Sequence, residues 1–233
     1  MLTYPLDITN EADVNNVFAD LRQRLPSGRD IDALVLSAAS ISAGTLALDY
    51  TPAELRARAL RRTSLATATS CAPSSRRGPS KGPEARTEKV VLDVSTHSAY
   101  ERYPTQALYG ASKAAFTQYM RHVHAGYAHT GLRVHAYHPG GIFTEAAQAV
   151  GYSKEAVPWD DVSLPAGLAV WLASPAAAFL NGRFLLAYCD VDELVAMNDQ
   201  FEKDQDLGKI VLKIKPDVCL GGSSVNIPHC GTA

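Results

Sequence analysis

Residues 32–39 read DALVLSAA, an apolar run of strand length that ends in small residues. An unbroken apolar run, in place of alternating apolar and polar residues, is typical of a strand covered on both faces in a parallel sheet. Two further runs, residues 89–94 and 132–137, have the same character. The three stretches predict buried strands, and a sheet that contains them decides the fold.

Helical patterns lie between these strands. Thr9 or Asn10 is placed to cap a helix whose apolar positions 14, 17, 18 and 21 repeat at helical spacing. Residues 51–54, TPAE, form a capping box, and residues 105–130 and 163–173 also predict helices. Short strands are expected at residues 2–8 and 184–188. This alternation predicts an α/β fold with a doubly wound parallel sheet.

Composition narrows the classes of function. The 233 residues carry a formal net charge of −2 and no basic stripe, which argues against nucleic acid or an anionic membrane as a partner. The sequence has no apolar run of about 18 residues and no charged, apolar leader. The four cysteines are scattered and the histidines lack carboxylates at ligand spacing, so no metal site is expected. We expect a cytoplasmic protein.

Residues 109–113 read YGASK. On a helix, side chains four positions apart share a face, so the Lys113 ammonium can lie beside the Tyr109 phenol. A nearby cation favours the phenolate and lowers the pKa of a tyrosine from its usual value of about 10, which suits proton transfer near neutral pH. A chance spacing on an exposed helix face is the alternative interpretation.

Two further segments with polar or glycine residues follow predicted strands on either side of this pair in the sequence. Thr96 stands thirteen residues before Tyr109, at the carboxyl end of the predicted strand 89–94. The predicted strand 132–137 is followed by HPGGIFT, residues 138–144. Open α/β sheets bind ligands at the carboxyl ends of their strands, so these segments are expected to meet in one crevice. A strand-end hydroxyl and a plain Pro-Gly-Gly turn are the simpler alternatives.

In this order and spacing, the strand followed by Ser-Thr, the Tyr-x-x-x-Lys and the Pro-Gly-x-x-x-Thr elements resemble the short-chain dehydrogenase/reductase family. The resemblance covers residues 1–212. It implies that Tyr109 is the catalytic acid/base, and that Lys113 binds the nicotinamide ribose and depresses the pKa of the tyrosine. It also implies that Thr96 polarises the substrate carbonyl, with Ser95 and Ser98 as weaker candidates.

The resemblance further implies residues that line a dinucleotide, NAD or NADP. Around the nicotinamide and its phosphates they are Pro139, Gly140, Ile142 and Thr144, together with Tyr109 and Lys113. Asp7 would contact the adenine, although a helix-capping role is the alternative for this residue. Ala38 and Ala39 stand where the family has Asn-Asn-Ala-Gly.

Two features depart from the family pattern. The family opens with a strand, a Gly-rich turn and a helix whose N-terminus receives the pyrophosphate, whereas this sequence begins at what resembles the third strand. We therefore expect a Rossmann-like fold truncated at its N-terminus, with an apolar edge exposed on the strand 32–39. Residues 61–88, where the family's helix with a catalytic asparagine belongs, are irregular. They predict either a solvated basic loop or a stretch read in a shifted frame.

These expectations give one domain over residues 1–212 and a loose tail over residues 213–233. The expected activity is NAD(P)-dependent interconversion of a carbonyl and an alcohol on a small organic substrate, impaired if the missing segments are needed. The alternatives are a non-catalytic remnant or interaction module, and an epimerase or dehydratase that uses the same Tyr–Lys pair. Neither nucleic acid nor a membrane is an expected partner, and a homo-oligomer is left open.

Overall fold

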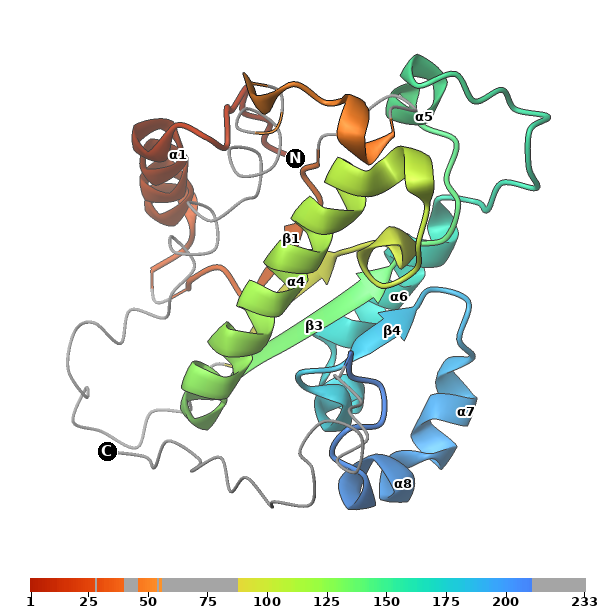
Figure 1. Ribbon diagram of the computed structural model, residues 1–233. Helices are drawn as coiled ribbons and strands as arrows, with labels where there is room; N and C mark the ends of the chain where they lie inside the picture. The colour runs from red at the N-terminus through yellow and green to blue at the C-terminus, as the bar shows by residue number, and fades with distance from the viewer. Residues whose placement is uncertain (28, 40–45, 54, 56–87, 211–233) are drawn as a thin grey trace, which may run out of the picture.

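The computed structural model describes residues 1–27, 29–39, 46–53, 55 and 88–210. In this part of the chain, four parallel strands form one sheet in the order β1-β2-β3-β4 (Figure 1). The strands are β1 (Ala33–Leu36), β2 (Lys89–Val94), β3 (Leu132–His138) and β4 (Phe184–Leu186). Leu36 pairs with Asp93, and Val94 pairs with Tyr137, so the strands end along one edge of the sheet.

The helices of the described residues alternate with these strands. They are α1 (Glu11–Arg24), α4 (Ala107–Tyr127), α5 (Glu145–Ala149), α6 (Ser163–Ala173), α7 (Val191–Ala196) and α8 (Asn198–Lys203). Short 3₁₀ turns are η1 (Ala47–Asp49), η3 (His97–Ala99), η4 (Pro104–Gln106), η5 (Ala128–Thr130) and η6 (Pro175–Leu180).

Helices cover both faces of the sheet. On one face, Phe116 and Met120 of α4 pack against Val91 of β2. On the other face, Leu168 of α6 lies in the same apolar cluster as Leu92 of β2. Because successive side chains of a strand point to opposite faces, both sides of β2 are buried, as its unbroken apolar sequence predicts. The predicted α/β fold with a parallel sheet is confirmed.

Capping signals mark two predicted helix starts. The Asn10 side chain accepts hydrogen bonds from the backbone N–H groups of Ala12 and Asp13 at 3.1 and 3.4 Å, so Asn10 caps α1. After the predicted capping box, the Leu55 N–H donates to the Thr51 carbonyl oxygen at 3.0 Å, as in a first helical turn. Local hydrogen bonds therefore begin both helices where the sequence places them.

One predicted strand is wrong and two are shorter than predicted. Residues 2–8 form no strand, because the described sheet offers them no neighbouring strand and Asp7 begins a turn. The Asp7 carboxylate accepts from the Thr9 N–H and hydroxyl at 2.9 and 2.8 Å. The predicted strands 32–39 and 184–188 end early, at Leu36 and Leu186, where their pairing with β2 and β3 ends.

Strand β1 lies at the end of the described sheet, and its Val35 is 48% exposed. Residues 61–87 and the predicted tail, residues 213–233, lie outside the described residues, so the shifted-frame interpretation stays a prediction. Among the residues that the structure describes, no helix combines the length and apolar character needed to cross a membrane.

Candidate active site

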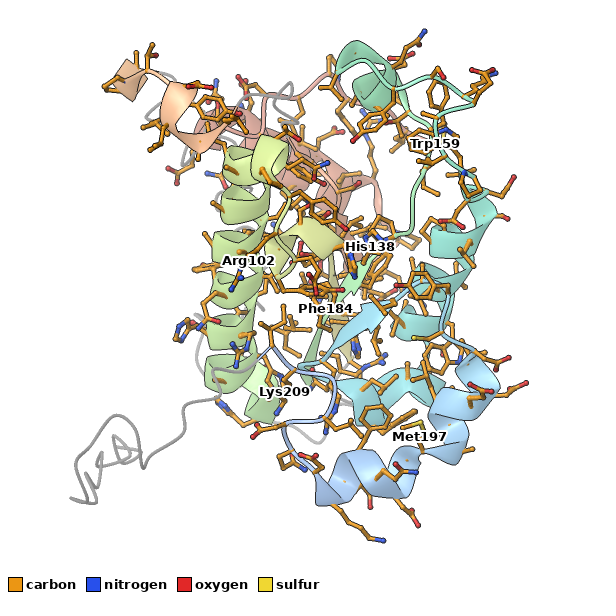
Figure 2. All side chains as sticks on the ribbon, turned by 45° about the vertical axis from the view of Figure 1, so that its right-hand side comes forward. Arg102, His138, Trp159, Phe184, Met197 and Lys209 are labelled. Carbon is orange, nitrogen blue, oxygen red and sulfur yellow. The ribbon has the colours of Figure 1, made fainter. Side chains whose placement is uncertain are left out.

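Three predicted segments follow neighbouring strands and lie at the edge where those strands end (Figures 1 and 2). Ala38 and Ala39 are exposed directly after β1. Thr96 is buried two residues after β2, and Pro139 begins the half-buried turn after β3. Parallel pairing from β1 to β3 therefore gives all three segments a common edge.

Thr96 and Tyr109 meet at this edge. Thr96 is the N-cap of η3, where its hydroxyl oxygen accepts from the Ser98 N–H at 3.3 Å. The Tyr109 side chain, in the first turn of α4, lies close enough to Thr96 for the Thr96 side chain to lower the pKa of the phenol. Gly110 permits the close approach, because a Cβ at this position would lie 2.4 Å from the Ser98 carbonyl oxygen. Glycine in the YGASK stretch thus lets α4 lie against η3.

Lys113 lies one turn further along α4 and is buried. Its ammonium donates to the Val94 carbonyl oxygen at 2.5 Å, which ties α4 to the end of β2. Burial lowers the pKa of Lys113, while the nearby Asp93 carboxylate raises it. The net shift of the Lys113 pKa is downward.

The expected lowering of the Tyr109 pKa by Lys113 is wrong for this structure. Burial raises the pKa of Tyr109, the hydrogen bond with Thr96 lowers it, and the charge of Asp93 raises it again, with a net upward shift. The physical reason is that Tyr109 is largely removed from water and that a buried anion opposes the field of the Lys113 ammonium.

The two serines that flank Thr96 are engaged elsewhere. Ser95 is buried, and its hydroxyl is hydrogen-bonded to the Thr117 hydroxyl at 2.7 Å. The Ser98 hydroxyl donates to the Gln106 side-chain oxygen at 2.5 Å. Of these three hydroxyls, the Thr96 hydroxyl is therefore the one that interacts with Tyr109.

The turn after β3 is fixed by a residue distant in sequence. Gly140 has a φ of 88°, a backbone conformation that other residues rarely adopt. The Gly141 N–H donates to the Asp160 carboxylate at 2.8 Å, and the Asp160 N–H donates to the Gly141 carbonyl at 2.7 Å. These bonds close the segment 142–159. Thr144 caps α5 by accepting from the Ala147 N–H at 3.1 Å.

Within the closed segment, residues 142–159, the large aromatic side chains are those of Phe143, Tyr152 and Trp159. The Trp159 ring lies 5.3 Å from Phe143 and 5.7 Å from Tyr152, measured between centroids. In Figure 2, His138 lies at the end of β3, and Trp159 lies beyond that end. Asp7, by contrast, belongs to the turn before α1, where its carboxylate accepts from the N–H and the hydroxyl of Thr9.

Two histidines support the turn that presents Thr96, and neither was singled out from the sequence. The His97 N–H donates to the His138 Nδ1 at 3.2 Å, and the two rings stack with centroids 5.3 Å apart. Burial lowers the pKa of His138, and the charge of His97 lowers it further. The usable signal was position, because both follow buried strands at their carboxyl ends. Within the described residues, no group of three or more His, Cys, Asp or Glu could hold a metal ion.

Sequence comparisons identify relatives over most of the chain. The family model described as enoyl-(acyl carrier protein) reductase matches residues 1–188. Short chain dehydrogenase/reductase AacuD of Aspergillus aculeatus is 36% identical over 223 residues, which cover 92% of this chain and 70% of that protein. A short chain dehydrogenase/reductase of Claviceps purpurea is 45% identical over 119 residues, which cover 50% of this chain and 40% of that protein.

Solved structures share the fold. A gluconate 5-dehydrogenase from Burkholderia cenocepacia J2315, in complex with NADP and tartrate, superposes with a TM-score of 0.64 at 22% identity. The superposition covers 78% of this chain and 71% of that one. A 4-hydroxyisoleucine dehydrogenase complexed with NADH gives a TM-score of 0.57 at 21% identity, over 78% of this chain and 77% of that one. Together with the sequence matches, these findings show that the chain belongs to the short-chain dehydrogenase/reductase family.

Proposed function

We propose that the protein is an NAD(P)-dependent oxidoreductase that interconverts a carbonyl and an alcohol on a small organic molecule, with residues 1–212 as its catalytic domain. The observation that carries this proposal is the grouping of Thr96, Tyr109 and the buried Lys113, whose ammonium donates to the Val94 carbonyl oxygen, at the edge where the strands end. Family membership supports it, as do the two structural neighbours with NADP or NADH bound.

The roles follow from the hydroxyl positions. In reduction, the Tyr109 O–H donates its proton to the carbonyl oxygen as negative charge develops there; in oxidation, the Tyr109 phenolate accepts the alcohol proton. The Thr96 hydroxyl donates to the same oxygen and stabilises its charge. Because the Thr96 and Tyr109 side chains interact at one strand end, one substrate oxygen can approach both hydroxyls.

The residues at the strand ends fit the nicotinamide end of a dinucleotide. When bound, the dinucleotide supplies or accepts a hydride. An ammonium has three donors, so Lys113 can bind Val94 and still donate to a ribose hydroxyl. We propose that the nicotinamide and its phosphates are held by Pro139, Gly140, Ile142 and Thr144. We propose that the adenosine lies near Asp7, Ala38 and Ala39.

The test is oxidation of NADPH or NADH by the full chain, with phenanthrenequinone as the probe carbonyl. Tyr109→Phe should remove most of the rate and leave the affinity for NADPH nearly unchanged, because its hydroxyl acts on the developing alkoxide. Thr96→Ala should cost about 10²- to 10³-fold, whereas Thr96→Ser should be tolerated.

Ser98→Ala is the matched control, because its hydroxyl bonds to Gln106. Full activity in Thr96→Ala together with loss in Ser98→Ala would overturn the assignment of Thr96. Failure of the unchanged protein to oxidise either dinucleotide across a panel of probe carbonyls would overturn the proposed activity.

A further inference from the structure

A polar stripe runs along the buried face of α4, under the candidate active site. Tyr109, Lys113 and Thr117 follow one another at intervals of four residues, so they share one face of the helix. Each meets a group at the carboxyl end of β2 or just beyond it. The first two contacts, with Thr96 and with the Val94 carbonyl, belong to the site described above. The third contact is new.

The third contact joins Thr117 to Asp93 and Ser95. The Thr117 hydroxyl donates to one Asp93 carboxylate oxygen at 2.8 Å, and its oxygen lies 2.7 Å from the Ser95 hydroxyl. Asp93, Ser95 and Thr117 are 0%, 2% and 3% exposed. The other Asp93 oxygen is buried and has no hydrogen-bond partner within the described part of the chain. The Asp93 side chain is therefore held in place with incomplete hydrogen bonding.

An ionised carboxylate at 0% exposure is costly in a protein interior unless a cation lies near it. Lys113 supplies this cation. It lies one helical turn before Thr117 on the same face of α4, and its ammonium donates to the carbonyl oxygen of Val94, next to Asp93. The Lys113 and Asp93 charges each stabilise the charged form of the other group, and the Asp93 charge also raises the pKa of Tyr109 and of Tyr137. Asp93 is thus the anion that Lys113 and Tyr109 share.

We propose that Asp93 is a positioning residue that acts on Tyr109 through Lys113, with its carboxylate balancing the ammonium charge and Thr117 holding the carboxylate in place. The inference rests on the proposed function of the Tyr109–Lys113 pair. An ionised Asp93 keeps Lys113 charged and cancels part of the field that would favour the Tyr109 phenolate. A neutral side chain at position 93 would leave Tyr109 facing an unopposed ammonium.

Asp93→Asn separates charge from geometry. The asparagine side-chain oxygen can still accept from Thr117, so the hydrogen bond is kept while the charge is lost. Removal of the anion should lower the pKa of Lys113, since Asp93 raises it. It should also lower the pKa of Tyr109, for the same reason. A residue with a merely structural role would move neither pKa.

The first measurement does not depend on activity. Competitive acetylation of the full chain with acetic anhydride, read by mass spectrometry across a pH series, gives an apparent pKa for Lys113. We expect this pKa to be lower in Asp93→Asn than in the unchanged protein, because Asp93 raises it. Asp192→Asn, at an exposed position in α7, is the matched control and should leave the Lys113 pKa unchanged. An unchanged Lys113 pKa in Asp93→Asn would overturn the proposal.

The second measurement is the pH profile of alcohol oxidation with NADP⁺ and a probe alcohol that the unchanged protein oxidises. Asp93→Asn should shift the rising limb to lower pH, because more of Tyr109 is then phenolate at a given pH. A lower rate with an unmoved limb would show a structural role and overturn the proposal. If no alcohol is oxidised by any variant, the proposed function fails, while the Lys113 labelling still decides the role of Asp93.

If Asp93→Asn fails to fold, Thr117→Val and Thr117→Ser take its place. Valine removes the hydroxyl that stabilises the Asp93 carboxylate, whereas serine keeps it. Thr117→Val should raise the pKa of Asp93, because the carboxylate loses the hydrogen bond that lowers its pKa. In urea denaturation across a pH series, the pH-dependent loss of stability assigned to Asp93 should therefore extend to higher pH in Thr117→Val and keep its range in Thr117→Ser. Identical pH dependence in the valine and serine variants would overturn the proposal that Thr117 holds the Asp93 carboxylate in place.

Discussion

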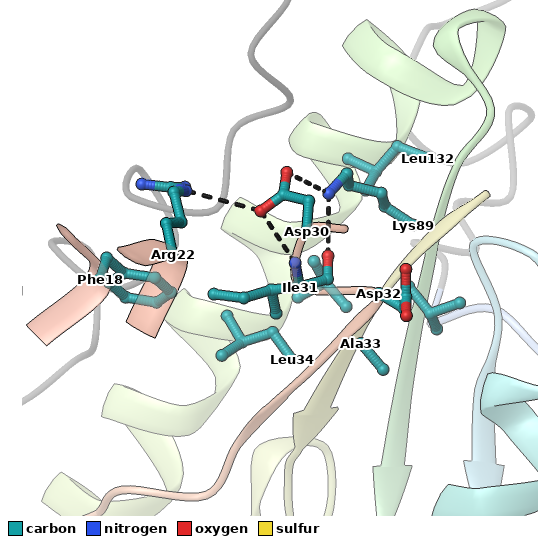
Figure 3. A pocket seen from close by; sticks show the side chains of 11 residues that line it. Phe18, Arg22, Asp30, Ile31, Asp32, Ala33, Leu34, Lys89 and Leu132 are labelled. Atoms are coloured by element: carbon teal, nitrogen blue, oxygen red, sulfur yellow. Dashed lines mark hydrogen bonds and ion pairs between the residues drawn. The ribbon is translucent and has the colours of Figure 1, made fainter. Parts of the chain in front are cut away.

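A lysine and a carboxylate interact near each end of strand β2, through a direct ion pair at its first residue and through their charges near its last residue. At its first residue, Lys89 donates to the Asp30 carboxylate at 2.5 Å, and Arg22 lies 3.5 Å from the same group. These residues line a small open pocket at the edge of the sheet where the strands begin (Figure 3). Near its last residue, Asp93 is fully buried and faces Lys113 of α4.

The difference in burial reverses the direction of the pKa shift. At Asp30, partial burial raises the pKa of the carboxyl, but the hydrogen bond and charge of Lys89, with other contacts, lower it by more. At Asp93, burial raises the pKa to about 6, although Lys113 and Thr117 lower it. A lysine and an aspartate thus form a partly hydrated ion pair at one end of β2. At the other end, the aspartate is a buried group whose ionisation destabilises the fold as pH rises.

The largest expected effect comes from removing the buried cation. Lys113→Met leaves Asp93 buried without its partner and should lower the free energy of unfolding by about 3–5 kcal/mol, measured well above pH 6 so that Asp93 would be ionised. Lys89→Met should cost at most about 1 kcal/mol, because Asp30 keeps Arg22 and contact with water. Urea denaturation measures both variants. Equal losses of unfolding free energy in the two variants would show that burial does not distinguish the two ends of β2.

The next effect is a pH dependence. The Asp93 carboxyl ionises near its ordinary value of 3.8 when unfolded and near about 6 when folded, so the folded state binds the extra proton between these values. Relative to Asp93→Asn, the unchanged protein should therefore lose roughly 3 kcal/mol of stability as pH rises through this interval, and no more above it.

Urea denaturation of both proteins across this pH range provides the measurement. His135, whose pKa burial lowers to about 4, titrates in the same range in both proteins, so its contribution cancels in the difference. A stability difference that stays constant with pH, or that rises with pH, would contradict the buried, pKa-raised state of Asp93.

A smaller effect concerns packing at the two ends of α4. Gly110→Ala places a Cβ 2.4 Å from the Ser98 carbonyl oxygen, so the backbone near Thr96 must shift, at a cost of about 1–3 kcal/mol. Gly126→Ala is the matched control, since nothing lies within 4 Å of its Cβ position. That variant should gain up to about 1 kcal/mol from helix propensity. Thermal or urea unfolding distinguishes the two, and a neutral Gly110→Ala would mean that α4 and η3 are not in tight contact.

The sequence predicted the central elements of the fold because their signals are local. Strands β2 and β3 are unbroken apolar runs, and α4 and α6 keep helical spacing over several turns. Residues 2–8 were predicted as a strand from composition, but a strand exists only with a hydrogen-bonded neighbour. The Asp7–Thr9 contacts make a turn at the end of that stretch.

The grouping of the candidate residues could be predicted from the sequence, whereas the electrostatics of the site could not. Spacing, strand-end position and the family resemblance selected Thr96, Tyr109 and Lys113, and the structure brings these residues to the end of β2, while their catalytic roles stay predictions. The direction of the Tyr109 pKa shift depends on burial and on Asp93, and both are set by how α4 packs on β2. The available signal was Asp93 itself, an acidic residue within an otherwise apolar strand that needs a buried partner.

The smallest expected effect is at the exposed end of β2. The Asp30 side chain is 38% exposed and that of Lys89 is 20% exposed, so Asp30→Asn should change the free energy of unfolding by at most about 1 kcal/mol. Because folding lowers the pKa of Asp30, the advantage of the unchanged protein should be present at neutral pH and lost as pH falls through the folded-state pKa. This sign is opposite to that expected for Asp93.

Salt at about 1 M should reduce the advantage, since exposed ion pairs are screened, whereas the Asp93→Asn difference should persist. Asp32→Asn, which removes the more exposed Arg29–Asp32 pair, is the matched control and should have still less effect. If Asp30→Asn lost more stability than Asp93→Asn changes, and salt did not reduce this loss, burial would not be what distinguishes the two ends of β2.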